Sequence, residues 1–345
     1  MAERLIEILV PPEDHERALA ILEEHEHDAL WTHRSDEYAV IEILVGIDEV
    51  EPIVDELVDA FPGKDQLRVA VMKVESSIPS TEESEASKPE EPEPQRPLLL
   101  RWLDPATRIS RDEIRAQLAQ GAALDVTYLA MVLLSAVVAA IGLQRDNVAV
   151  IVGAMVIAPL LGPNMALAFA TTTGDEELFA RSARVSAVGV VAAFLFSYAV
   201  GWLAPVGGEL QRELHSRTVV GLGDIALALA SGAAGSLALV TGSGMSLVGV
   251  MVAVALLPPL VTFGMLLASG KGDAAAGAGV LLATNVICVN IASMTTFIVR
   301  GVRPKGWWRL ERSARSTRVA MIVWLSLLAV VSVYIVRTQF ADQLP

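Results

Sequence analysis

The feature that most constrains this chain is a series of seven apolar stretches, each long enough to cross a hydrocarbon layer about 30 Å thick. Soluble domains rarely contain such stretches, and charged residues make up only 19% of these 345 residues. We therefore expect an α-helical polytopic membrane protein. The predicted spans are residues 126–143, 147–170, 185–205, 223–241, 246–269, 275–299 and 319–337.

Basic residues gather in alternate connections between these spans. Four arginines precede the first span, two separate the second from the third, and the connection 300–318 is the most basic of all. Cytoplasmic loops of membrane proteins are enriched in Lys and Arg. The pattern predicts a multi-pass protein of the cell (inner) membrane, with a cytoplasmic N-terminus and an external C-terminus.

The front of the chain has a different pattern. Short apolar runs alternate with helix-periodic segments in the order strand, helix, strand, strand, helix, strand, which is typical of a ferredoxin-like α+β sandwich. We expect this cytoplasmic domain over residues 1–75. Residues 1–73 hold 19 acidic and 6 basic groups, and this excess of negative charge argues against nucleic acid as a partner.

The region between the two parts changes character twice. Residues 76–96 are rich in Pro, Glu and Ser, which predicts a disordered acidic linker. Residues 97–124 combine leucines, a tryptophan and several arginines, which indicates an interfacial segment with a helix near 111–119. The transmembrane domain then covers residues 125–337, and residues 338–345 form a C-terminal tail.

An internal repeat is the most informative pattern within the spans. The segment from Val152 to Leu160 resembles the segment from Val248 to Leu260, and the glycine that opens each motif is offset by 96 residues. An aspartate opens the first span of each copy, Asp125 before Val126 and Asp224 before Ile225, where capping is the simplest role. Each copy holds three spans, and an odd number predicts an inverted 3+3 repeat plus one further span.

Prolines fall near the middle of the second span in each copy. Proline removes an amide donor and clashes with the carbonyl four residues earlier, so both spans should kink or break. Freed backbone groups cannot face lipid, and transporters place substrates between such paired broken helices. The predicted pathway residues at these two sites are Pro159, Gly162, Pro163, Pro258 and Pro259. The alternative is that the prolines only bend the helices.

These motifs identify a family. The run from Gly153 to Pro163, followed by Leu256-Leu257-Pro258-Pro259, resembles the hydrophobic domain of unknown function family 389. The resemblance covers residues 120–300 and implies an integral membrane protein. This family has no established activity to carry over, and the N-terminal domain and linker lie outside its core.

Few polar side chains lie within the spans. Asn164 follows the first proline motif, and Asn285 and Asn290 lie in the sixth span, in a stretch from Asn285 to Ser293 that covers about two helical turns. Such residues must face other helices or water. We predict that these three asparagines contribute to the pathway, and the equally good alternative is that they hold helices together.

A metal site in the soluble domain is a further candidate. His25 and His27 lie within a run that also holds four carboxylates, and this combination suits a divalent ion such as zinc. The competing interpretation is a solvated acidic helix end. No nucleophile–base set, phosphate loop or paired catalytic carboxylate is recognisable, so we do not expect an enzyme, and no cofactor is predicted.

Two functional hypotheses follow. The first is a transporter or channel for a small solute or ion, working in the lipid bilayer as a homo-oligomer, with the soluble domain serving assembly or regulation. The second is a membrane scaffold or sensor that transports nothing, in which the soluble domain binds a metal or metabolite.

Overall fold

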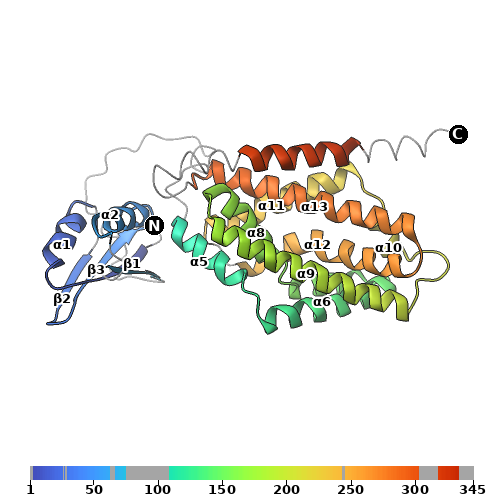
Figure 1. The fold of residues 1–345 in the computed structure, drawn as a ribbon, viewed down its shortest axis with the longest axis horizontal. Helices are drawn as coiled ribbons and strands as arrows, with labels where there is room; N and C mark the ends of the chain where they lie inside the picture. The colour runs from blue at the N-terminus through green and yellow to red at the C-terminus, as the bar shows by residue number, and fades with distance from the viewer. Residues whose placement is uncertain are drawn as a thin grey trace. The chain divides into compact units, whose positions relative to one another are not determined.

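A computed structural model describes residues 3–25, 27, 29–62, 67–74, 109–242, 245–302 and 318–333, with the backbone alone for residues 245–255 (Figure 1). The predicted linker 76–96, the tail 338–345 and most of the connection 300–318 lie outside these residues. The chain divides into two compact units, Met1–Ile114 and Arg115–Pro345, and each is described by itself.

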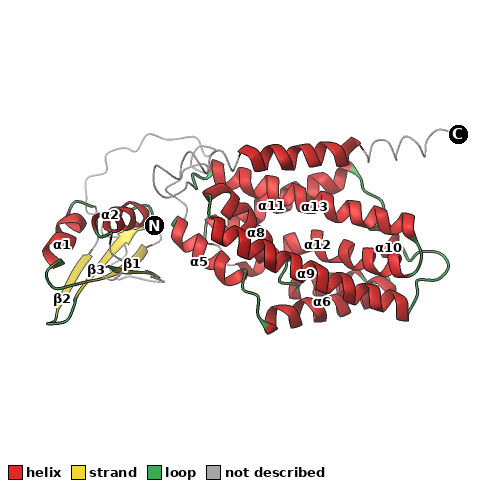
Figure 2. Ribbon diagram, viewed as in Figure 1, coloured by secondary structure: helices red, strands yellow, loops and turns green. Residues whose placement is uncertain are grey.

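The first unit is built on a four-stranded antiparallel sheet with the order β2-β3-β1-β4. Its elements follow the predicted order of strands and helices (Figure 2). They are β1 (Glu3–Val10), α1 (His15–Glu23), β2 (Ala29–Arg34), β3 (Ala39–Gly46), α2 (Val50–Ala60) and β4 (Arg68–Lys73).

One face of this sheet forms the core of the unit. Side chains alternate between buried and half-buried along β1 and β3, as strand geometry requires. Ile6 pairs with Ile43 and Ile8 with Ile41, and all four are fully buried. Helices α1 and α2 pack on this face through residues such as Leu22, Ile53 and Leu57. The alternating pattern of the sequence therefore decides which face the helices cover.

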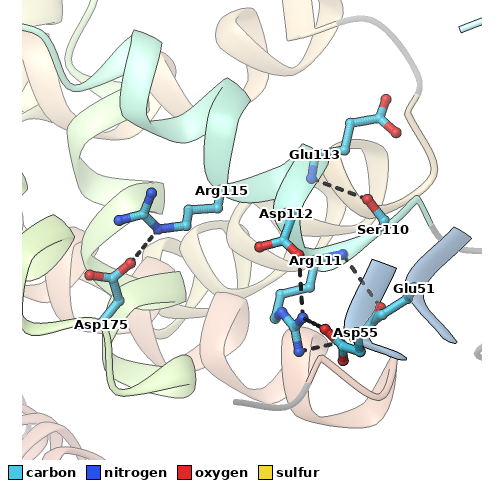
Figure 3. Close-up of polar contacts among 8 residues, drawn as sticks. All are labelled: Glu51, Asp55, Ser110, Arg111, Asp112, Glu113, Arg115 and Asp175. Carbon is cyan, nitrogen blue, oxygen red and sulfur yellow. Dashed lines mark hydrogen bonds and ion pairs between the residues drawn. The ribbon is translucent and has the colours of Figure 1, made fainter. Parts of the chain in front are cut away.

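Helix α5 (Arg111–Gly121) begins in the first unit and ends in the second. The Ser110 hydroxyl oxygen accepts a hydrogen bond from the Glu113 amide at 3.2 Å, and this bond caps the first turn (Figure 3). The Arg111 side chain, only 7% exposed, lies 2.9 Å from Asp55 and 3.4 Å from Glu51. Burial alone would lower the pKa of Arg111, but Asp112, Glu51 and Asp55 together outweigh it and raise the pKa.

All the regular secondary structure in the described residues of the second unit is helical. Most of its helices coincide with the predicted spans (Figure 2). They are α6 (Val126–Gln144), α7 (Val148–Ile157), α8 (Leu161–Thr173), α9 (Glu176–Leu203), α10 (Arg212–Ser216), α11 (Leu222–Val240), α12 (Met245–Ala268), α13 (Gly272–Val299) and a last helix, Arg318–Val333, called helix 318–333 below.

Capping bonds fix where two of these helices begin. The Asp125 carboxylate accepts a hydrogen bond from the Tyr128 amide at 2.6 Å and starts α6. The Asp224 carboxylate, in the first turn of α11, accepts one from the Gly221 amide at 2.8 Å. The capping roles predicted for both aspartates are confirmed.

Four helices among the described residues are long and apolar enough to cross a membrane, namely α6, α9, α11 and α13. The pair α7 and α8 makes a fifth if it counts as one span. The other two predicted spans coincide with α12 and helix 318–333, whose described apolar parts, Leu256–Ala268 and Arg318–Val333, are shorter. Seven spans therefore remain a prediction.

The two proline motifs behave differently. Helices α7 and α8 meet at a bend of 54° around Pro159, so the first predicted break is present. Helix α12 runs unbroken through Pro258 and Pro259, so a break there is wrong, and a kink at these prolines stays a prediction. Both motifs remove two amide donors, but their positions differ: Pro163 lies in the first turn of α8, where amides have no intrahelical partner, so a new helix can begin after Pro159.

Helices α8 and α12, the proline-containing helices of the two predicted copies, make corresponding contacts. Helix α8 packs against α13, and α12 packs against α9, so the second span of each predicted copy contacts the third span of the other. Each of them also packs against the third span of its own copy, α8 against α9 and α12 against α13. An inverted repeat would produce this exchange, but the repeat itself stays a prediction.

Candidate functional site

Two of the predicted pathway residues meet at the interface between α8 and α13. The side-chain amide nitrogen Nδ2 of Asn290 donates a hydrogen bond to Oδ1 of Asn164 at 2.9 Å, although the two residues are 126 positions apart. Asn164 is 6% exposed and Asn290 is 2% exposed. Asn164 lies in the first turn of α8, directly after the break, so the break and the polar pair form one site.

The two asparagines use different side-chain groups in their hydrogen bonds. Nδ2 of Asn290 also donates to the Val286 carbonyl at 2.8 Å, so both of its hydrogens are used. The side-chain group that Asn290 leaves for another molecule is its carbonyl oxygen, a hydrogen-bond acceptor. On Asn164 the carbonyl accepts, and the buried Nδ2 has no hydrogen-bond partner among the described residues.

Other polar side chains of α13 divide into two groups. The hydroxyl groups of Thr284, Thr295 and Thr296 donate to carbonyls one turn earlier in the same helix, so they are satisfied locally. Ser293 instead reaches other helices: its hydroxyl lies 3.3 Å from the Met165 sulfur on α8 and 3.3 Å from the Gly232 carbonyl on α11. Asn290 and Ser293 thus join α13 to its neighbours.

A cavity of about 820 Å³ adjoins the asparagine pair. It lies between α8, α9, α13 and helix 318–333, and its volume falls in the range of pockets that hold small molecules. Most of the side chains that line it are apolar. The lining residues are Leu167, Ala170, Thr171, Gly174, Asp175, Glu176, Phe179, Ala183, Asn290, Val319, Ala320, Val323 and Trp324.

Two carboxylates at the start of α9 belong to this lining. Asp175 caps α9 by accepting from the Leu178 amide at 3.0 Å. Its other oxygen accepts a hydrogen bond from Arg115 on α5 (Figure 3). Glu176 follows in the first turn of α9. Among the described residues, the polar groups of the lining therefore belong to Asn290, Thr171 and these two carboxylates, and Trp324 adds a side chain with an indole N–H donor.

The glycine of the first proline motif has a packing role. A Cβ atom on Gly162 would lie 2.8 Å from the Gly121 carbonyl oxygen, so only glycine permits this approach between α8 and the end of α5. Gly162 and Pro163 lie in the first turn of α8, and Pro159 lies in the bend before it. These three residues shape the backbone and do not line the cavity.

The remaining predicted residues lie apart from this site. Asn285 is buried in α13, 6% exposed, and does not line the cavity. Pro258 and Pro259 lie within α12, which contributes none of the lining residues. Thr171, Phe179 and Trp324 line the cavity without having been singled out in the sequence. No motif marks them, because three different helices bring them together.

The histidines proposed for a metal site bind different partners. The ring nitrogens of His25 lie 3.2 Å from Glu49 and 2.9 Å from Glu56, and Nδ1 of His27 lies 2.9 Å from the His25 carbonyl oxygen. Within the described part of the chain, no group of three or more His, Cys, Asp or Glu side chains could hold a metal ion. The metal site therefore stays a prediction from the sequence.

Comparison with known proteins shows that this site lies within the part of the chain that matches a family model. The family model described as domain of unknown function (DUF389) matches residues 155–291, which include both Asn164 and Asn290. An uncharacterized protein of Methanocaldococcus jannaschii is 32% identical over 298 residues, covering 86% of this chain and 88% of that protein. No solved structure matches the chain.

Proposed function

We propose that this chain, which belongs to the DUF389 family, is a membrane transport protein for a small solute or ion. One observation carries the proposal. Asn290 both lines the cavity and binds Asn164, and Asn164 lies one turn beyond the break between α7 and α8. The cavity thus adjoins a buried polar pair that lies one turn beyond a helix break, and transporters bind substrates near such breaks.

The position of the break supports a pathway. Pro159 lies in the middle of the predicted span 147–170, which α7 and α8 together occupy. If this pair crosses the bilayer as one span, the break falls near the midplane, where unsatisfied backbone groups are costly. A polar ligand or water there would satisfy them.

The buried pair also fits transport better than simple packing. Within the part of the chain that the structure describes, the Asn164 Nδ2 group has no hydrogen-bond partner, and a buried unpaired donor costs about 1–3 kcal/mol. A pair serving only to join α8 and α13 would gain nothing from leaving this donor unused. A pathway that exchanges hydrogen bonds with a passing solute gives the unused donor a role.

The wider arrangement belongs to the same proposal. Seven spans with a 3+3 inverted repeat would place α8 and α12 as counterparts, and the matching contacts of α8 with α13 and of α12 with α9 support this. The N-terminal unit would be a ferredoxin-like cytoplasmic domain that assembles or regulates a homo-oligomer in the inner membrane. No catalytic step is part of the proposal.

Solute flux into proteoliposomes tests the proposal. Val323 lines the cavity and is 49% exposed, so Val323→Trp should fill the space without disturbing a buried core. Val330→Trp is the matched control, because Val330 is 67% exposed on the same helix and does not line the cavity. Potassium, chloride, phosphate, acetate, glycine and methylammonium form the panel of solutes.

We expect at least one of these solutes to enter faster than in protein-free liposomes. Val323→Trp should reduce that flux at least tenfold, and Val330→Trp should leave it unchanged. Flux of every solute at the protein-free rate would favour the membrane scaffold or sensor instead. Equal flux through the wild type and Val323→Trp would place any pathway outside this cavity.

A further inference from the structure

Helix α8 begins among buried residues and has no cap. The residue before its first turn is Leu160, whose side chain offers no hydrogen-bond acceptor. The first amides of an α-helix have no partner within that helix, and proline has no amide hydrogen at all. Among the described residues, no hydrogen bond caps the amide of Leu161 or Gly162. These two N–H groups are therefore left as donors.

A third unused donor lies beside them. Asn164 belongs to the first turn of α8 and is 6% exposed, and its Nδ2 group has no hydrogen-bond partner among the described residues. Side chains of an α-helix lean towards its N-terminus, so this group is directed at the start of α8. The Asn290 amide already occupies the Asn164 Oδ1 atom, which leaves Nδ2 for another molecule.

The start of α8 favours negative charge. A helix N-terminus carries about half of a positive elementary charge, and its free amides bind anions. The first turn of α8 contains no acidic residue that would already use this charge. The backbone amides and the Asn164 side chain therefore call for the same kind of ligand, one that supplies hydrogen-bond acceptors and a negative charge.

Burial and access limit which anions fit. Gly162 and Pro159 are half-buried, and Gly162 has no side chain to shield its amide, so an ion can approach there. Leu160, Leu161 and Asn164 are buried. The three donors are neutral, and the cost of removing an ion from water rises steeply with its charge. A monovalent anion is therefore favoured over a divalent one.

We propose that the start of α8 binds a monovalent anion, held by the amides of Leu161 and Gly162 and by Nδ2 of Asn164. The ligand is a halide or the carboxylate of a small solute, because both present a single negative charge and the same acceptor chemistry. This inference rests on the proposed function for the view that the bound anion is also the transported one. Binding itself is measured without transport.

Chloride NMR tests the site on the purified full-length chain in detergent. Chloride that exchanges with a protein site gives a broader signal, so the excess linewidth over protein-free detergent reports binding. We expect a saturable excess that bromide or acetate reduces and that sulfate at the same ionic strength does not. Reduction by acetate assigns the site to carboxylate-bearing solutes, and reduction by bromide alone assigns it to halides. No excess linewidth, or equal reduction by sulfate, would overturn the proposal.

The variant Asn164→Asp separates the donor from the packing of this residue. It keeps an oxygen for the Asn290 amide but replaces Nδ2 with a carboxylate oxygen, so the excess linewidth should fall about fivefold or more. Asn147→Asp is the matched control, because Asn147 caps α7 at its far end from the break and aspartate caps equally well. The control should keep the wild-type linewidth. An unchanged linewidth in Asn164→Asp would overturn the site.

A second variant covers the case in which Asn164→Asp does not fold. Leu160→Asp places a carboxylate at the N-cap of α8, where it can accept from the Gly162 amide and take the place of the anion. This variant should lose the excess linewidth. Wild-type linewidth in Leu160→Asp would contradict the assignment to the start of α8.

Failure of this inference differs from failure of the proposed function. Chloride broadening that Asn164→Asp abolishes, with no flux of any solute, would support the anion site and refute transport. Flux that Val323→Trp blocks, with no chloride broadening, would refute the anion site and support the pathway.

Discussion

Replacing Arg111 with methionine should destabilise the first unit more than the loss of any exposed arginine. Its side chain is only 7% exposed, and its guanidinium lies 2.9 Å from Asp55 and 3.4 Å from Glu51, both on α2. Methionine keeps much of the apolar stem but removes the charge and its hydrogen bonds. Both carboxylates would then lose their cationic partner.

The size of the effect follows from how exposed the carboxylates are. Breaking a fully buried ion pair costs about 3–5 kcal/mol, and an exposed pair contributes about 0–1 kcal/mol. The side chain of Glu51 is 19% exposed and that of Asp55 is 36% exposed, so water can partly replace the lost guanidinium. We therefore expect a loss of about 2 kcal/mol of unfolding free energy, between these two limits.

Urea unfolding of the fragment 1–121, which keeps α5 whole, measures this loss by circular dichroism. With a slope of about 2 kcal/mol per molar urea, the midpoint should fall by about 1 M. Arg68→Met is the matched control, because Arg68 is exposed on the edge strand β4 and forms no ion pair within the described residues. Its midpoint should stay within about 0.3 M of the wild type. Equal midpoints for the two variants would refute the role given to Arg111.

Three further outcomes test other parts of the structure. Gly232→Val places a Cβ atom 2.8 Å from the Val289 backbone. This overpacking of α11 against α13 should cost about 1–3 kcal/mol and lower the melting temperature in detergent. Gly153→Val should leave the melting temperature unchanged, because the space around Gly153 is open. In a Cys288→Ser background, Ser216→Cys and Thr241→Cys flank α11 and should be labelled from opposite sides of the membrane, so labelling from one side would refute α11 as a span. The melting temperature of the fragment 1–76 should rise with sodium chloride. Zinc should raise this temperature no more than magnesium does at matched ionic strength, because the His25 ring already binds two carboxylates. A rise specific to zinc would establish a metal site.

Much of the local structure could be predicted from neighbouring residues. Alternating apolar residues place the strands of the first unit and its buried face. Asp125 and Asp224 mark the starts of two helices through hydrogen bonds to amides three residues away. Pro159 and Pro163 predict the break between α7 and α8. Each of these depends on interactions within a few residues along the chain, so the sequence alone is sufficient.

The candidate site depends on contacts that no local pattern encodes. Sequence reasoning selected Asn164, Asn285 and Asn290 because each is polar within an apolar span, but it could not decide which of them meet. The packing of α8 against α13 joins Asn164 to Asn290 across 126 residues and brings Asn290 to the lining of the cavity. Polarity within a span requires only that a side chain avoid lipid, and many helix arrangements satisfy that requirement. The tertiary structure selects one arrangement, because only the complete packing of α8, α9, α13 and helix 318–333 fixes which side chains surround a common space.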